Sequence, residues 1–188
     1  KSSEMKAQGI DVINMSVGEP DFMTPDHVKE AGKKAIDDNF SKYSPVPGYP
    51  VLREAIVKKL KQENHLDYAV SEIVVGTGGK QGVCNAILAL VNPGDEVIIP
   101  APYWVSYPQM VKLAGGVPVI VSAGIEQDFK ITAEQLEHAI TPKTKMIILC
   151  SPSNPTGSVY SAEELESLAK VVLAHDDLFV LSDEIYEH

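Results

Sequence analysis

The chain has 188 residues, of which 44% are hydrophobic and 22% charged, as in an ordinary globular protein with a core large enough to fold alone. Its formal net charge of −10 excludes the basic character typical of nucleic-acid-binding proteins. No apolar stretch reaches the roughly 20 residues that a membrane helix needs, and the polar first residues lack the apolar segment of a signal peptide.

The first part of the chain predicts two helices separated by an irregular loop. Thr24 and Pro25 begin a helix that extends to about Asp38, with proline at the first helical position. Residues 42–50 contain three prolines and a glycine, so they cannot form regular structure. Apolar residues at helical spacing then predict a helix over residues 51–64.

Strand and helix patterns alternate from residue 73 onward. Short apolar runs predict strands at 73–75, 96–99, 117–121, 145–150 and 178–181. Helices are predicted between them at 79–90, 102–114, 132–140 and 161–174, and capping boxes open the last two. This alternation predicts an α/β fold, a three-layer αβα arrangement around a largely parallel sheet.

The same patterns suggest a division into two parts. Residues 1–24 do not fit the alternation, and we assign them to an N-terminal segment, an arm or part of a smaller domain. Residues 25–188 form one large domain. Because the chain stops directly after a predicted strand, we expect this domain to be incomplete at its C-terminal end, with an open sheet edge and exposed apolar surface.

Two predicted strands end in polar groups that suit a flat heteroaromatic ligand. Asp183 ends the last strand and Tyr186 follows three residues later, while Asn154 lies in the loop 151–157 after the preceding strand. Open α/β sheets bind ligands at these strand ends. An acid, a phenol and an amide match a ring nitrogen and a ring hydroxyl. Pyridoxal phosphate has both, and an aspartate beside its ring nitrogen recurs in proteins.

The segment Gly76–Lys80 follows a predicted strand and opens a helix. Its backbone amides and the positive end of the helix dipole favour an anion such as a phosphate, although a tight turn alone would use the same glycines. Gln81 stands where a dinucleotide fingerprint needs glycine, and no Ser or Thr follows Lys80 as a P-loop requires. The sequence therefore indicates a phosphate site of another kind, or a structural turn.

Other candidates allow two interpretations each. Trp104, the only tryptophan, follows a strand and could stack on a flat ligand or pack in the core. Tyr43, in a proline-stiffened loop, could reach a ligand or a neighbouring subunit, or decorate the surface. Cys84 and Cys150 have apolar neighbours and are interpreted as buried thiols of a reducing, cytoplasmic compartment. The histidines and acids show no metal-ligand spacing, so no metal is predicted.

Taken together, six motifs occur in an order and at a spacing that resemble a known family. They are Gly18–Phe22, the K-Y-x-P-x-x-G-x-P-x-L-R pattern of 42–53, Pro93–Val97, Pro102 with Tyr107, Ser151–Gly157 and Ser182–Tyr186. The chain resembles, over its whole length, the class I and II aminotransferases of pyridoxal-phosphate fold type I, in the subgroup of bacterial aspartate aminotransferases.

The resemblance implies roles around the cofactor ring. Asp183 would pair with the ring nitrogen and keep it protonated, and Tyr186 and Asn154 would hydrogen-bond the ring 3′ oxygen. Trp104 would stack on the ring. Asp183 and Tyr186 would be the catalytic residues in this chain, and Trp104 and Asn154 would also face the substrate.

It also implies roles for the phosphate and the substrate. Backbone amides of Gly79 and Lys80 would hold the phosphate, and Tyr43 would reach the phosphate of a partner subunit in a homodimer. Gly18 would lie near the substrate α-carboxylate. The Lys80 ammonium would meet the distal carboxylate of an acidic substrate, or would simply add to phosphate binding.

In that family, the Schiff-base lysine and the arginine for the α-carboxylate lie beyond the last motif, and Arg53, the only arginine, belongs to a helix motif. We therefore expect an N-terminal fragment, inactive alone, of an enzyme that transfers an amino group from an amino acid, aspartate, to a 2-oxo acid. The alternatives are another fold type I enzyme, such as an aromatic aminotransferase or a β-lyase, and a non-catalytic ligand-binding remnant.

Overall fold

A computed structural model describes residues 2–13 and 22–187 of the chain. They belong to two compact units, residues 1–45 and residues 46–188. The sequence places a boundary after residue 24 instead, and its assignment of 1–24 to an arm and 25–188 to one large domain stays a prediction.

The first unit contains two helices, α1 (Ser2–Ala7) and α2 (Asp26–Asp37). Helix α2 confirms the helix predicted at 25–38. Pro25 is its N-cap residue and not, as predicted, its first helical residue, which is Asp26; the N–H of Asp38 closes the last turn by donating to Lys34 O at 2.8 Å. The loop that follows leaves the side chain of Tyr43 fully exposed.

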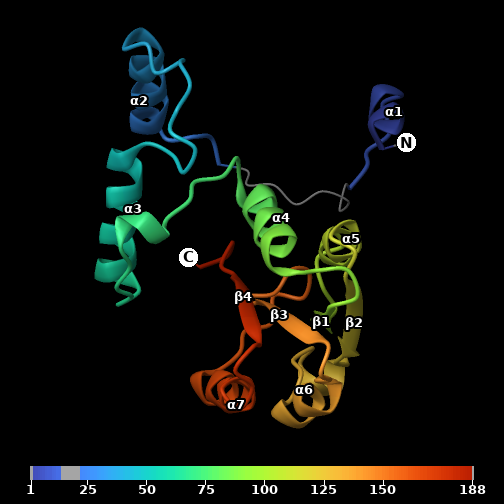
Figure 1. Cartoon of the computed structure of the whole chain (residues 1–188). Coiled ribbons are helices and arrows are strands. Elements are labelled where there is room, and N and C mark those ends of the chain that lie inside the picture. The colour runs from blue at the N-terminus through green and yellow to red at the C-terminus, as the bar shows by residue number, and fades with distance from the viewer. Residues whose placement is uncertain (1, 14–21, 188) are drawn as a thin grey trace. The chain divides into compact units, whose positions relative to one another are not determined.

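The second unit is a three-layer αβα structure (Figure 1). Its parallel sheet has the strand order β2-β1-β3-β4. Two helices cover each face: α4 and α5 lie on one side, and α6 and α7 lie on the other. The bounds are β1 Glu96–Ala101, β2 Val117–Ser122, β3 Thr144–Cys150, β4 Phe179–Asp183, α4 Gly79–Leu90, α5 Tyr107–Leu113, α6 Ala133–Ala139 and α7 Ala162–Val172. The predicted α/β class is confirmed.

The core follows from the alternation of side chains along the two central strands. Val97 and Ile99 of β1 point to the face covered by α4 and α5, whereas Ile98 between them points to the face covered by α6 and α7. In β3, Ile147 pairs with Ile98 and is likewise fully buried. Because both faces are buried here, each of these strands carries a continuous apolar run, 97–101 in β1 and 146–150 in β3.

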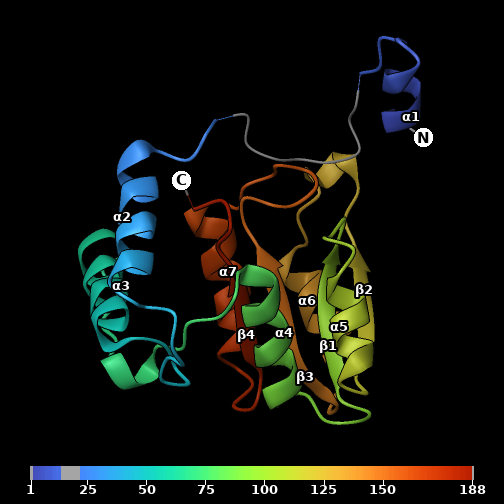
Figure 2. The ribbon, with the colours of Figure 1, turned by 90° about the horizontal axis from the view of Figure 1, so that it is seen from above.

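Parallel strands bring all their carboxyl ends to one edge of the sheet. Figure 2 shows the start of α4 and the loops that follow the strands at this same edge. The pairing of β3 with β4 places Cys150 opposite Asp183. The edge is therefore the place where groups from distant parts of the chain can meet.

Both capping boxes exist as predicted. Thr132 and Gln135 close the first turn of α6, and Ser161 and Glu164 close that of α7, each side chain bonding the other residue's backbone N–H. Local side-chain chemistry therefore determines where these two helices begin.

The strand predicted at 73–75 is wrong. A 3₁₀ turn (η1, Val70–Glu72) precedes these residues, and they pair with no strand. The N–H of Val75 donates to Pro47 O at 3.0 Å, and Arg53 Nε of α3 (Pro50–Glu63) donates to Ile73 O at 2.9 Å. The backbone groups of Ile73 and Val75 that could have paired in a sheet are thus hydrogen-bonded to the Arg53 side chain and to the loop residue Pro47.

The helix predicted at 102–114 begins five residues late, at Tyr107. Pro108 occupies its first turn, where the missing N–H costs nothing, and Gly115, with a φ of 82°, follows its end. Residues 102–106 form an irregular segment instead. A second short 3₁₀ turn, η2 (Ile125–Gln127), lies between β2 and α6.

Candidate active site

A cavity of about 230 Å³ opens at the carboxyl edge of the sheet. This volume is below the roughly 300–1,000 Å³ of sites for drug-sized ligands, so it suits a ligand built on one ring. Its lining comes from α4, from the segments after β1 and β3, and from β4 and the residues after it. The lining residues are Gly79, Lys80, Trp104, Tyr107, Cys150, Asn154, Asp183, Ile185 and Tyr186. Six of the residues predicted from the sequence to form the site therefore meet in one place: Gly79, Lys80, Trp104, Asn154, Asp183 and Tyr186.

Asp183 is the carboxylate of this cavity and ends strand β4. Its Oδ2 accepts a hydrogen bond of 2.6 Å from the Tyr107 hydroxyl, and its Oδ1 accepts one of 3.3 Å from the N–H of Ile185. Both oxygens are thus engaged on the protein side, which fixes the orientation of the carboxylate.

Tyr107 is a site residue to which the sequence analysis gave no role. It is only 2% exposed, and burial together with its hydrogen bond to Asp183 raises the pKa of its hydroxyl far above the usual value. The hydroxyl therefore keeps its proton and acts as a donor. The motif that pairs Pro102 with Tyr107 marks Tyr107 in the sequence, but its contact with Asp183 becomes visible only in the fold.

Trp104 packs against the core, as one of its two interpretations predicts, and it also lines the cavity, while its stacking on a ligand stays a prediction. Its ring meets the Tyr107 ring edge to face, with centroids 5.4 Å apart and planes at 87°. The Lys80 ammonium lies 4.9 Å from the Trp104 ring centroid, within the range of a cation–π contact. The indole is thereby held from two sides.

Helix α4 begins at the cavity with a left-handed glycine. Gly78 has a φ of 87° at the N-cap position, which a side chain would strain. Gly78 O accepts from the N–H groups of Gln81 and Gly82, at 3.1 and 3.3 Å. The N–H groups of Gly79 and Lys80 belong to the first turn, where a helix offers them no carbonyl, so they are available to an anion.

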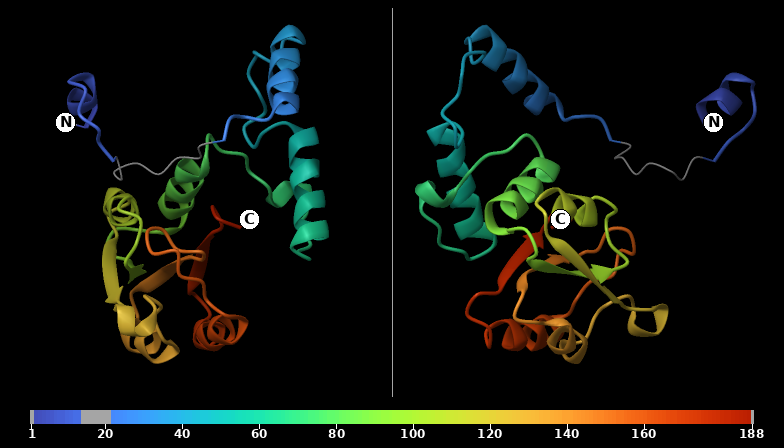
Figure 3. Two further views of the ribbon diagram at one scale, coloured as in Figure 1. Left: turned by 180° about the vertical axis from the view of Figure 1, so that it is seen from behind. Right: turned by 45° about the vertical axis from the view of Figure 1, so that its right-hand side comes forward.

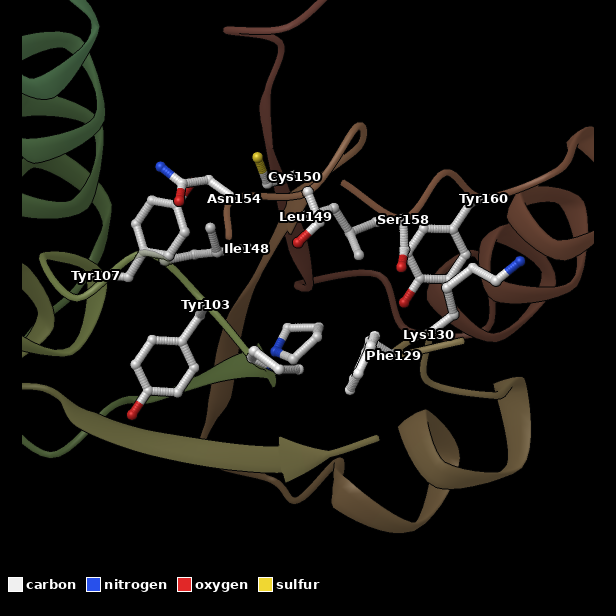
Figure 4. A pocket seen from close by; sticks show the side chains of 13 residues that line it. Tyr103, Tyr107, Phe129, Lys130, Ile148, Leu149, Cys150, Asn154, Ser158 and Tyr160 are labelled. Carbon is white, nitrogen blue, oxygen red and sulfur yellow. The ribbon is translucent and has the colours of Figure 1, made fainter. Parts of the chain in front are cut away.

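Asn154 lies in the loop after β3 and lines two neighbouring cavities. This loop, drawn in orange in Figure 3, connects β3 to α7. The second cavity, of about 20 Å³, has room for about one water molecule and shares Tyr107, Cys150 and Asn154 with the first. Figure 4 shows its wall, with Ser158, Tyr160 and Lys130 on the far side. The inner side of the candidate site is therefore nearly filled, by apolar and polar side chains together.

Tyr186 lines the cavity from the segment after β4 and is 46% exposed. Tyr43 lies in the first unit, 1–45, and Gly18 lies outside the described residues, so the roles predicted for them stay predictions. Both cysteines are free thiols. They are partly exposed rather than buried, because Cys150 borders the cavity and Cys84 lies at the margin of the core.

Within residues 2–13 and 22–187, no helix is long and apolar enough to cross a membrane. No cluster of three or more His, Cys, Asp or Glu side chains in the same ranges could hold a metal ion.

Comparison with known proteins gives a consistent result. The family described as "Aminotransferase class I and II" matches residues 10–188. A "Probable aspartate/prephenate aminotransferase" of Rickettsia bellii is 57% identical over 188 residues, which are all of this chain and 47% of that protein. The chain thus spans about half the length of this relative.

Solved structures agree with this match. An aspartate aminotransferase from Thermus thermophilus, solved with maleate, is 48% identical with a TM-score of 0.95, over 100% of this chain and 49% of that one. An aromatic aminotransferase from Pyrococcus horikoshii is 42% identical with a TM-score of 0.91, over 100% of this chain and 50% of that one. The fold of this chain is therefore shared with about half of each of these two proteins.

Proposed function

The chain belongs to the class I and II aminotransferases, and we propose that it is part of an enzyme that uses pyridoxal 5′-phosphate to transfer an amino group between an amino acid and a 2-oxo acid. The observation that carries this proposal is Asp183, whose carboxylate ends β4 at a cavity shared with Asn154, Trp104 and Tyr186. The names of the relatives support the same reaction.

The residues of the cavity fit this cofactor group by group. Asp183 offers a carboxylate to a protonated ring nitrogen, and Trp104 offers a flat face to the ring. Asn154 and Tyr186 offer hydrogen bonds to the ring 3′ oxygen. The first amides of α4, at Gly79 and Lys80, are placed for the phosphate. When bound, the cofactor supplies an electron sink for chemistry at the substrate α-carbon.

In this proposal the protein side chains hold a proton and orient the ring. Asp183 keeps the proton on the ring nitrogen, because its charge stabilises a pyridinium. Tyr107 keeps Asp183 aimed at that position, since it fixes Oδ2 from behind and cannot lose its own proton at ordinary pH. Trp104 and Tyr186 restrict the ring to one orientation.

We propose that the substrates carry a second carboxylate, with aspartate as the amino donor. Lys80 is the cation of the cavity wall, and Gly18 is proposed to lie near the α-carboxylate. The Thermus thermophilus relative was solved with maleate, a dicarboxylate, and prephenate, named for the Rickettsia bellii relative, also carries two carboxylates. An aromatic amino donor is the second candidate, supported by the Pyrococcus horikoshii relative.

The proposal includes the setting of the enzyme. We propose a homodimer in which Tyr43 contacts the phosphate of the partner subunit, and a location in the cytoplasm. The exposure of Tyr43 supports the first of these, because a fully exposed loop tyrosine is available to another chain.

The test uses the full-length protein with Asp183→Ala. Without the carboxylate the ring nitrogen loses its proton, so turnover with aspartate and a 2-oxo acid should fall by about two orders of magnitude or more. Asp95→Ala, which removes a carboxylate from the turn before β1, is the control and should leave turnover unchanged. Near-normal turnover in Asp183→Ala would refute the assignment, and a full-length protein that binds the cofactor without transamination would favour a non-catalytic role.

A further inference from the structure

The carboxylate of Glu187, next to Tyr186 in the chain, is held by the end of helix α3. Lys59 Nζ lies 2.6 Å from Glu187 Oε2, and the Asn64 amide donates to Glu187 Oε1. Lys59 also donates to Asn64 Oδ1 at 2.8 Å. Lys59, Asn64 and Glu187 thus close a triangle of hydrogen bonds, which we call the α3 clamp.

The clamp anchors the far end of a short segment whose near end is Asp183. Sheet pairing fixes Asp183, and its Oδ1 accepts from the N–H of Ile185 at 3.3 Å. The N–H of Glu187 donates to Glu184 O at 3.1 Å and forms a turn. Ile185 and Tyr186 lie between the two anchors and line the cavity. Any shift of Glu187 must therefore move Tyr186.

We propose that the α3 clamp positions Tyr186 in the cavity. The inference rests on the proposed function, because it assigns Tyr186 to the cofactor ring. Lys59 and Asn64 are not among the residues that line the cavity, so they are positioning residues that act through Glu187.

The α3 clamp affects Tyr186 because of where it lies in the chain, and not because its hydrogen bonds are strong. The Lys59 and Glu187 side chains are 32% and 28% exposed, and partly exposed ion pairs contribute little to global stability. Tyr186, however, follows the end of a strand and is half-exposed, so few packing contacts restrain it. A weak network is then sufficient to select one orientation of its ring.

The helix offers a matched control. Lys61, two residues from Lys59 on α3, pairs with Asp67 at 2.6 Å and makes no contact with the segment after β4. Lys61→Met removes an ion pair of the same type from the same helix, while Lys59→Met opens the clamp. Lys59→Arg keeps a charged donor in place and should behave like the unmodified protein.

The first measurement uses the full-length protein with pyridoxal phosphate. We expect Glu187→Ala and Lys59→Met to raise the Kd of the cofactor by about two- to fivefold, the range of such an ion pair. They should shift the pH midpoint of the cofactor's visible absorption in the direction in which Tyr186→Phe shifts it. Lys61→Met should change neither quantity. Adding Glu187→Ala to Tyr186→Phe should shift the midpoint no further, because the two changes act through one hydroxyl.

The second measurement needs no cofactor. In the cofactor-free full-length protein, the amides of residues 185–187 should exchange hydrogen faster in Glu187→Ala than in Lys61→Met. Equal exchange, or an additive shift in the double variant, would overturn the proposed positioning. A full-length protein that fails to bind pyridoxal phosphate would refute the proposed function instead, and the exchange experiment would still decide whether the clamp holds the segment.

Discussion

The hydroxyl of Tyr107 lies 2.6 Å from Oδ2 of Asp183, and 76 residues of chain separate the two. Tyr107 opens helix α5 and Asp183 ends strand β4, so this contact joins a covering layer of the second unit to the last strand of its sheet. This hydrogen bond fixes the orientation of a carboxylate that lines the cavity.

Tyr107→Phe in the full-length enzyme tests this relationship. The ring would remain buried while the donor is lost, and a hydrogen bond to a charged group contributes about 1.5–3 kcal/mol. We expect kcat/KM for transamination to fall by about tenfold. Because the raised pKa keeps Tyr107 protonated, the loss should be the same from pH 6 to pH 9. Tyr103→Phe is the control, since that hydroxyl points away from the small cavity (Figure 4). A loss confined to one end of the pH range would contradict a purely donating role.

Lys80→Ser tests the choice of substrate. If the ammonium meets the distal carboxylate, the charge-assisted contact contributes about 1.5–3 kcal/mol, so kcat/KM for aspartate should fall at least about tenfold. An uncharged amino donor should be nearly unaffected. Equal losses for both donors would assign Lys80 to the phosphate and remove the main reason for a preference for aspartate.

Arg53→Met tests the attachment of α3. Arg53 donates Nε to Ile73 O at 2.9 Å and Nη2 to Val70 O, so its loss leaves two partly buried carbonyls without their donor. We expect the free energy of unfolding in urea to fall by about 1–2 kcal/mol. Lys58→Met, at an exposed position of the same helix, should change it by less than about 0.5 kcal/mol. Similar values for the two variants would show that the guanidinium contacts do not contribute.

Glu164→Ala tests a dependence of stability on pH. The Ser161 N–H and then Lys130 lower the pKa of Glu164 below its usual value of 4.5. A lowered carboxyl pKa stabilises the folded state fully above the unfolded value, and this stabilisation is lost as the pH falls through the folded value.

The variant should therefore melt at a lower temperature than the unmodified protein at pH 7, and the difference should shrink below about pH 4.5. Glu166→Ala, which breaks the exposed pair with Lys170 on the same helix, should show a smaller difference at pH 7. A difference that grows in acid would mean that the sign of this linkage is wrong.

The sequence predicted those features that local chemistry decides. The capping boxes at Thr132 and Ser161 were correct, because a side chain and a backbone three residues away are enough to form them. The strand predicted at 73–75 is wrong, because a run of three apolar residues does not reveal whether its backbone groups bond to a neighbouring strand or to a loop. The start of α5 was misplaced because Pro102 and Pro108 both suit a first turn, and tertiary packing selects the second.

The site was partly predictable for a related reason. Asp183 ends a strand, and Asn154 and Trp104 each follow one, so the parallel sheet alone brings them to one edge. The contact of Tyr107 with Asp183 depends on which strands are neighbours, and the α3 clamp depends on where α3 ends. No local sequence pattern contains this information, whereas the strand order β2-β1-β3-β4 and the end of α3 at Glu63 supply it.

That strand order also bears on how the protein is made. The cavity lining begins at Gly79 and is complete only with Tyr186, and β4, which carries Asp183, can pair only once β3 lies beside β1. During synthesis, domains fold from the N-terminal side as the chain emerges. The ribosome must therefore release more than a hundred residues after the first amides of α4 before Tyr186 can join the cavity lining, and a nascent chain stalled before β4 would have the start of α4 without the carboxylate of Asp183.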